Sequence, residues 1–199
     1  MEPAEVIGQT PALAPPTNKQ ADRKYFVPAK GMEFLFSHPQ ACYVVVEAAN
    51  QYSKQPHFHS LLQDKEHKRL DLFGWKVYLS ATLLLRVANY SALLANYDYY
   101  NYSKIQELVE DLPEHKRPQL NAIINESQLI ARTVLQASMD VADTAARTSA
   151  TAVVMGGTSW LQASRIPKEL QLKVEDLPFD RDKLFSSQTH NVLHTMKAS

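Results

Sequence analysis

The chain has 199 residues, of which 45% are hydrophobic and 21% are charged, and its 21 basic residues balance its 21 acidic ones. A chain of this size can bury a real core as one domain or as two small ones. The charge balance argues against a domain that holds nucleic acid by charge alone, because such domains usually carry a basic excess. A local basic patch is still compatible with it.

The single cysteine, Cys42, excludes an intrachain disulfide and favours a reducing compartment. Its neighbours Ala41 and Tyr43 indicate a small core residue rather than a nucleophile. The longest apolar runs, such as residues 44–46 and 83–85, fall far short of the roughly 20 residues that span a bilayer. The chain does not begin with the basic and then apolar pattern of a signal peptide. We therefore expect no membrane span.

The first part of the chain is predicted to lack long regular elements. Residues 1–22 hold four prolines among small and polar residues, a composition that buries too little surface to offset the entropy of ordering. We predict a flexible leader there. Residues 24–39, rich in aromatics, are predicted to be an extended packing arm with short turns. Residues 42–53 could be strand or helix, with a short helix favoured, and residues 54–66 are predicted to be a loop.

Two long stretches of the chain contain neither proline nor glycine. They span residues 75–112 and 119–155, with Pro113 and Pro118 between them and a glycine pair after the second. Proline near a start and glycine just past an end are typical of helix boundaries. Each helix would be roughly 55 Å long at 1.5 Å per residue, whereas a compact domain of this size is about 35 Å across.

These lengths predict an all-α fold, in which long antiparallel helices form an elongated coiled-coil homodimer. The predicted organisation is a flexible leader over residues 1–22, followed by a helical dimerisation and interaction domain over residues 23–199. Within that domain the long helices cover about 68–111 and 118–155, and a C-terminal segment covers 158–199.

Apolar residues recur every seven positions in both stretches. The rows are Leu70, Val77 and Leu84 with Phe73, Val87 and Leu94 in the first, and Leu120, Val134 and Val141 with Ile123, Ile130 and Ala137 in the second. A seven-residue repeat predicts a left-handed seam between helices. The repeat is imperfect, because three serines also fall on these rows: Ser80, Ser91 and Ser127.

A row of mostly small residues runs beside each apolar row. Its members are Gly74, Ala81, Ala88 and Ala95 in the first stretch, and Ile124, Ala131, Ser138, Ala145 and Ala152 in the second. Small side chains allow another helix to approach closely. The candidate dimer or helix-packing residues are therefore Gly74, Ala81, Ala88, Ala95, Val134 and Ala145.

The first long helix is expected to break near Asn101. Ser103 with Gln106 fits a capping box, so residues 104–111 could form a separate short helix. At the other end of the domain, the glycine pair Gly156 and Gly157 is predicted to stop the second helix.

The C-terminal segment is predicted to hold shorter helices. Thr158 could cap one, Pro167 could open another, and residues 187–198 could form a last one. The apolar residues of this segment must either fold back on the bundle or accept a helix of a partner. The candidate partner-binding residues are Trp160, Leu170, Val174, Leu177 and Phe179.

No catalytic, cofactor or metal site is predicted. His190 and His194 have the spacing of two metal ligands on a helix, but no further ligand lies near them in the sequence. Asp140, Asp143 and Arg147 favour a structural ion pair, with Arg86 as a further partner.

Six of the nine tyrosines fall between residues 78 and 102. Aromatic side chains grouped on a helix can pack in a core, anchor a protein interface or stack on bases. Packing or a protein interface is favoured over base stacking, because the chain carries no excess of positive charge.

Five segments together resemble one family. They are KYFVPAKGMEFLFSHP (24–39), LDLFGWKVY (70–78), RVANYSALLANY (86–97), MDVADTAARTSATAVVM (139–155) and WLQASRIPKELQLKVEDLPFDRDKLFSSQT (160–189). The sequence resembles the Gag-like domain of vertebrate DIRS-type retrotransposons, including the versions captured by host genes, over nearly all of residues 22–199.

The resemblance implies an all-helical antiparallel coiled-coil homodimer without enzymatic activity. For the host versions it implies a nucleoplasmic protein that binds A-type lamins and the retinoblastoma protein and associates with chromatin. Two departures favour a host scaffold over a nucleic-acid-binding protein. The transposon proteins often have basic residues where this chain has Gly156, Gly157 and Thr158, and often have arginine at the position of Trp75.

Overall fold

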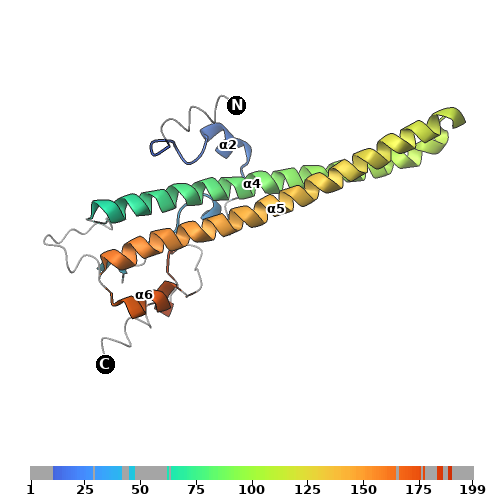
Figure 1. Ribbon diagram of the computed structural model, residues 1–199. Helices are drawn as coiled ribbons and strands as arrows, with labels where there is room; N and C mark the ends of the chain where they lie inside the picture. The colour runs from blue at the N-terminus through green and yellow to red at the C-terminus, as the bar shows by residue number, and fades with distance from the viewer. Residues whose placement is uncertain are drawn as a thin grey trace. The chain divides into compact units, whose positions relative to one another are not determined.

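The computed structural model describes residues 11–28, 30–41, 45–47, 62, 64–164, 166–175, 177, 183–185 and 188–189. These residues are mostly helical, and their only β-type pairing is a single bridge between Gln40 and Lys183. Two long helices, α4 (Lys65–Glu107) and α5 (Arg117–Ala163), pack against each other (Figure 1). The all-α prediction with two long helices is confirmed.

The chain divides into two compact units. The core unit comprises Met1–Leu83 and Arg147–Ser199, and the hairpin unit is Leu84–Ala146. Both long helices contribute to both units. The shorter elements are α2 (Lys19–Lys24), the 3-10 helices η1 (Glu33–Leu35), η2 (Leu108–Asp111) and η3 (Glu114–Lys116), and α6 (Lys168–Glu175).

In the hairpin unit the two helices run antiparallel. Ser138 donates a hydrogen bond to Ser91 (Oγ–Oγ 2.9 Å), and the Gln106 amide donates to Asn121 (Nε2–Oδ1 2.7 Å). The turn between the helices is closed by Arg117, whose guanidinium donates to two backbone carbonyls of the turn, those of Glu110 and Leu112. A charged donor on two carbonyls is a strong arrangement and fixes the hairpin connection.

The predicted break near Asn101 is wrong, because α4 continues to Glu107. Ser103 does not cap a new helix. Its hydroxyl donates to the carbonyl of Tyr99 one turn earlier (3.1 Å), which a serine inside a continuous helix commonly does. The sequence contains the capping-box pattern, but no helix begins at Ser103, so the pattern has no helix end to cap.

The predicted helix stop at Gly156 and Gly157 is also wrong, since α5 continues to Ala163. Both glycines are buried inside the helix. On the facing helix, a Cβ at Gly74 would lie 3.1 Å from the carbonyl oxygen of Ala152 and 3.2 Å from the amide nitrogen of Gly156. Gly74 therefore serves the close approach of the two backbones, whereas Gly156 and Gly157 lie inside α5 against side chains of other segments.

The interior of the core unit joins segments from both ends of the chain. Its buried residues are Val45, Leu62, Tyr78, Ala152, Val153, Trp160, Leu161, Val174, Leu184 and Phe185. Tyr78 is one of these residues and donates from its hydroxyl to the carbonyl of Phe34 (2.8 Å), while burial raises the pKa of Tyr78 to about 12. The aromatic arm of residues 24–39 is thus tied to α4.

The predicted leader contains a helix. α2 begins at Lys19, and the Asn18 side chain caps it by accepting a hydrogen bond from the Gln20 amide (2.8 Å). The residues before it contact α4 through Lys76 and Ser80. The average composition of residues 1–22 did not reveal this order, since one capping side chain and two side-chain donors on α4 are local features.

Several predictions on shorter elements meet the structure only in part. The helix after Pro167 is confirmed as α6. Residues 45–47 are helical, as favoured for 42–53, and residues 188–189 are helical within the predicted last helix, 187–198. The rest of those two stretches, with Cys42, lies outside the described residues.

Replacing Gly74 with alanine should destabilise the protein by about 1–3 kcal/mol, because its new methyl group meets backbone atoms that cannot move alone. This cost exceeds the gain of about 1 kcal/mol that alanine brings to a helix interior. Gly157→Ala is the matched control, since its methyl group would meet only the Phe185 ring at 3.4 Å. Chemical denaturation should show a loss for Gly74→Ala alone; an equal response of both variants would contradict the close approach.

Acid should destabilise the core unit through His38. Its Nε2 has no hydrogen-bond partner among the described residues, and its ring packs edge-on against Tyr78 with centroids 5.2 Å apart. Burial lowers the pKa of His38, so the fold prefers the neutral ring. Stability is then complete well above the unfolded pKa of about 6.5 and is lost as pH falls below it. Thermal unfolding at about pH 7.5 and about pH 5.5 should show a fall for the wild type and a smaller one for His38→Gln.

Candidate interaction surface

The contact between the helices of the hairpin unit is made mainly by small side chains. Its buried residues include Ala88, Ala95, Ala131, Ser138 and Ala145, the last fully buried, and Ile124 and Val109 are its only large buried hydrophobic residues. In the core unit, Gly74, Ala81 and Ala152 are buried as well. The row of small residues seen in the sequence therefore lies between α4 and α5 of a single chain.

The large apolar residues of the hairpin unit lie outside this contact. Twelve of them have exposed fractions between 38% and 69%, and seven of these twelve share one face of the hairpin. We call this set the outer apolar face: Leu84, Leu94 and Ile105 on α4, and Ile123, Ile130, Val134 and Val141 on α5. Six of the seven belong to the heptad rows of the sequence, and Val134, predicted as a packing residue, is 41% exposed.

A simple regularity places these seven residues on one face. Each precedes a buried residue by one or by four positions, as Leu94 precedes Ala95 and Val134 precedes Ser138. At about 100° per residue, both offsets turn the side chain to the same side of the buried row. In an antiparallel pair, that side is the same face of the hairpin for both helices, because reversing a helix also reverses its sense of rotation. The face is interrupted by Ser91, Asp98 and Ser127.

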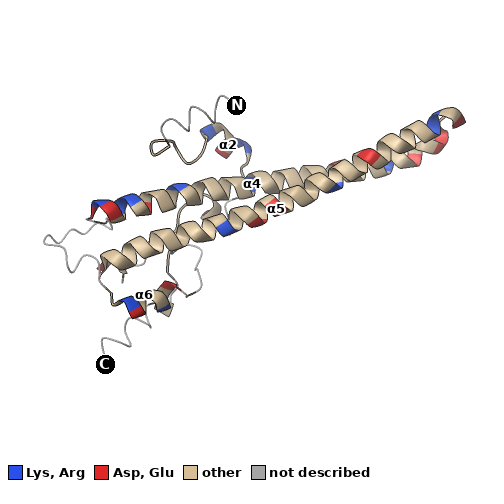
Figure 2. Ribbon diagram, in the orientation of Figure 1, with Lys and Arg blue, Asp and Glu red and all other residues tan. Residues whose placement is uncertain are grey.

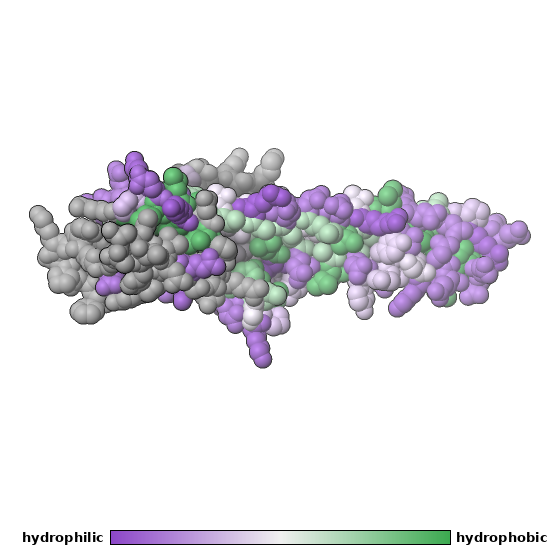
Figure 3. Space-filling model, turned by 90° about the horizontal axis from the view of Figure 1, so that it is seen from below, coloured by the Kyte–Doolittle hydropathy of each residue, from purple (hydrophilic) through white to green (hydrophobic). Residues whose placement is uncertain are grey.

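Few charges lie on the part of α4 that precedes Asp98. Between Lys76 and Asp98, the only charged residue of α4 is Arg86, which is buried (Figure 2). In a space-filling view, hydrophobic side chains gather along the helices, whereas the tip of the hairpin is hydrophilic (Figure 3). Exposed apolar side chains gathered along one face in this way are typical of an interaction site.

By length and composition alone, α4 with the turn after it, Lys65–Asp111, would be able to cross a membrane. Only 28% of its most apolar window is buried. The apolar runs of the sequence are short, because serine, asparagine and tyrosine interrupt them. They had therefore predicted no membrane span. A mostly buried core helix of a soluble protein passes the same criterion, so one such helix is weak evidence for a membrane span.

The exposed tyrosines lie near the hairpin tip. Tyr97 and Tyr100 are exposed, and the guanidinium of Arg132 lies 5.7 Å from the centre of the Tyr99 ring. Tyr97 and Tyr100 therefore do not pack in the interior of the hairpin. A protein interface and base stacking remain the two interpretations of this group.

The candidate partner-binding residues of the C-terminal segment are mostly interior. Trp160, Leu170 and Val174 are buried, and Leu177 is half-buried. The Trp160 indole donates to Asp71 (Nε1–Oδ1 3.2 Å), whose pKa burial raises. Of the two interpretations that the sequence left open, folding back on the bundle describes these residues. Phe179 lies outside the described residues.

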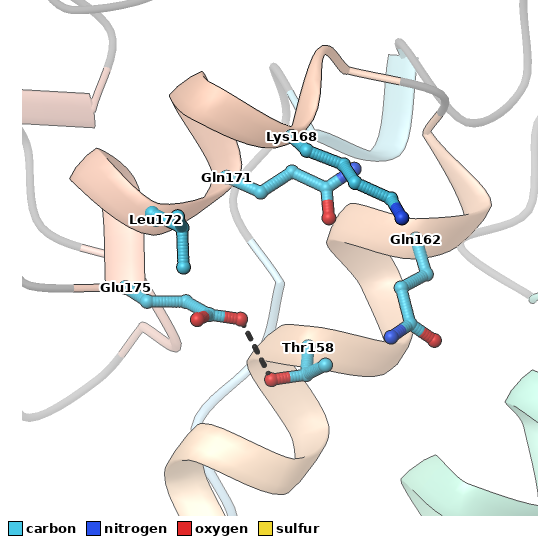
Figure 4. Close-up of a pocket in the computed structure, with 6 residues that line it drawn as sticks. All are labelled: Thr158, Gln162, Lys168, Gln171, Leu172 and Glu175. Atoms are coloured by element: carbon cyan, nitrogen blue, oxygen red, sulfur yellow. Dashed lines mark hydrogen bonds between the residues drawn. The ribbon is translucent and has the colours of Figure 1, made fainter.

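A small pocket of about 480 Å³ lies between the end of α5 and α6 (Figure 4). Its lining is polar except for Leu172, and Thr158 donates to Glu175 across it (2.8 Å). Thr158 was predicted to cap a helix; instead it lies inside α5 and joins α5 to α6. The remaining lining residues, Gln162, Lys168 and Gln171, bring no catalytic combination of nucleophile and base.

The described residues contain no group of three or more His, Cys, Asp or Glu side chains that could hold a metal ion. His190 and His194 lie outside them. Asp140 accepts a hydrogen bond from Gln136 (2.9 Å) on its own helix. Arg86, Asp143 and Arg147 each have an interaction in the structure, and the predicted ion pair among them stays a prediction.

Comparison of the chain with protein-family models, with curated proteins and with solved structures gives no match.

Enlarging Ala145 tests whether the small-residue contact sets the distance between the helices. Ala145→Leu should lower the free energy of unfolding by about 1–3 kcal/mol, because the fully buried site has no room for added carbons. Ala122→Leu, at an exposed position of the same helix, is the control and should be close to neutral. Equal stabilities of the two variants in thermal unfolding would show that Ala145 does not limit the approach of α4.

Proposed function

We propose that this chain is a non-enzymatic nuclear scaffold domain, which dimerises through the outer apolar face and binds A-type lamins and the retinoblastoma protein. It would act in nuclear organisation and cell-cycle control, in the nucleoplasm and in association with chromatin. The partners rest on the resemblance of its sequence to host-captured Gag-like domains. Among these, the sequence looks similar to the C-terminal domain of lamina-associated polypeptide two, alpha isoform.

One observation supports the dimer. Small residues meet between α4 and α5 within the chain, while the large heptad residues, such as Ile130 and Leu94, are 56% and 69% exposed. A heptad row stabilises a protein only when another helix covers it. A second hairpin, laid on the outer apolar face, would complete a four-helix arrangement of the kind common in helical bundles.

The magnitudes favour such a dimer. Two copies would bury fourteen side chains that are now about half exposed, at about 1 kcal/mol each. The gross gain of about 10 to 15 kcal/mol lies in the upper part of the range given for the cost of association, which is about 4 to 15 kcal/mol. Because a two-fold contact joins the same face of both copies, each apolar residue contributes twice.

Charges on the outer apolar face should separate the copies. The double variant Leu94→Asp/Ile130→Asp should be monomeric at micromolar concentration in sedimentation experiments in which the wild type is dimeric. The control is Leu129→Asp, since Leu129 is as exposed as these two residues but belongs to no heptad row. A monomeric wild type, or a double variant that stays dimeric, would overturn the proposed interface.

The same three proteins serve in a pull-down with A-type lamin and with the retinoblastoma protein. If dimerisation is required for binding, the double variant should lose both partners while Leu129→Asp retains them. A wild-type dimer that captures neither partner would disprove the scaffold function and leave the dimer standing.

The alternative function is a Gag-like nucleoprotein that assembles on nucleic acid. The exposed Tyr97 and Tyr100, with the Arg132 guanidinium beside Tyr99, are the observation in its favour. Binding to a single-stranded oligonucleotide that weakens steeply as salt rises would support it, because phosphate contacts release counterions. The lamin scaffold predicts no such binding.

A further inference from the structure

The N-terminal segment, residues 11–18, occupies a defined site on α4. The ammonium group of Lys76 donates to the carbonyl oxygens of Ala12 (2.7 Å) and Ala14 (2.8 Å), and the Ser80 hydroxyl donates to that of Pro16 (2.6 Å). Lys76 and Ser80 are four residues apart, so both donors project from one side of α4. All of these residues belong to the core unit.

The segment and the site are chemically complementary. Three prolines, Pro11, Pro15 and Pro16, remove backbone N–H donors from the segment, which is therefore rich in acceptors. A lysine ammonium has three donors and no acceptor, and the Ser80 hydroxyl acts as a donor here. A site that offers only donors suits a proline-containing segment, whose carbonyl groups accept hydrogen bonds. The site offers no acceptor to a segment whose backbone N–H groups also need one.

The segment is held without an apolar anchor. Leu13, its largest hydrophobic residue, is 81% exposed, while Ala14 and Pro16 are only half-buried. Its hold on α4 thus consists mainly of hydrogen bonds near the surface, which water can replace. Such a segment can be displaced by anything that offers α4 a larger apolar contact.

The position of the site on α4 identifies the competitor. Ser80 belongs to the heptad row Phe73, Ser80, Val87 and Leu94, and it lies one turn before Leu84, the first residue of the outer apolar face. The row that a second copy would cover therefore continues, on the same helix, into the stretch that contacts the N-terminal segment.

We infer that Lys76 and Ser80 form a binding site for an acceptor-rich, proline-containing segment, that residues 12–16 of the same chain fill it, and that this segment competes there with α4 or α5 of a second copy. The inference rests on the dimer proposed above. The segment limits how far the contact between copies extends toward the start of α4, and its release lengthens that contact.

Two variants of the full chain test this competition. Lys76→Met removes the donor to two of the three carbonyls and retains the length of the side chain. Replacing residues 12–16 with an equal stretch of glycine and serine leaves α4 unchanged and raises the entropic cost of docking the segment. In the second variant, a gain in dimerisation cannot come from a new apolar side chain on α4. Lys68→Met, an exposed lysine on the same helix, is the control for the loss of charge.

Trypsin cleavage after Lys19 measures release of the segment, and sedimentation measures the dimer dissociation constant. Both test variants should be cleaved faster than the wild type and should dimerise about tenfold more tightly, whereas Lys68→Met should match the wild type. Faster cleavage with an unchanged or weaker dimer would overturn the competition and leave the proposed dimer intact. Cleavage at the wild-type rate would show that these contacts do not hold the segment. A wild type that never dimerises would instead overturn the proposed function, and the competition with it.

Discussion

The close approach of α4 and α5 through small side chains is the constraint on which the rest of the structure depends. Ala88, Ala95, Ala131 and Ala145 occupy the contact, and none of them could span a wide gap between helices. A narrow contact buries little apolar area, so a hairpin of two such helices has a thin interior. The large apolar side chains of the hairpin unit lie outside this contact, and no other described part of the chain covers them.

In the hairpin unit, small residues are buried between the helices and large apolar residues are exposed. This arrangement links the stability of the hairpin to the proposed association of two copies. In the hairpin unit, Leu94 and Ile130 contribute little to the isolated chain because water still reaches most of their surface. If a second copy covers them, the stability of the hairpin depends on protein concentration. The hairpin is then better understood as half of a bundle than as a small domain.

The core unit solves the same problem within one chain. Here the aromatic arm, the end of α5 and α6 cover the helices with Tyr78, Trp160, Leu161 and Phe185. Polar bonds such as that from Tyr78 to the carbonyl of Phe34 then fix the covering segments in place. The N-terminal segment is a weaker covering, held by Lys76 and Ser80, and this difference in strength is what makes it displaceable.

The sequence by itself determined the two long helices, because heptad rows and the absence of proline and glycine are local properties of the chain. It also singled out the row of small residues and the row of large ones. It could not decide which row meets which helix, because either row is a possible seam until the chain folds back on itself. Only the tertiary structure showed that Ala145 faces inward and Val134 outward.

Tertiary contacts likewise overruled local signals at both helix ends. Gly156 and Gly157 match a helix stop in sequence, yet α5 continues through both, and both are buried against side chains from other parts of the chain. Trp160, Leu170 and Val174 form an apolar pattern that fits a core or a docking site equally well, and burial alone distinguishes the two. The positions of the long helices could be predicted from local sequence patterns. Which face of each helix is buried depends on contacts with residues distant in the chain, and no local pattern encodes these contacts.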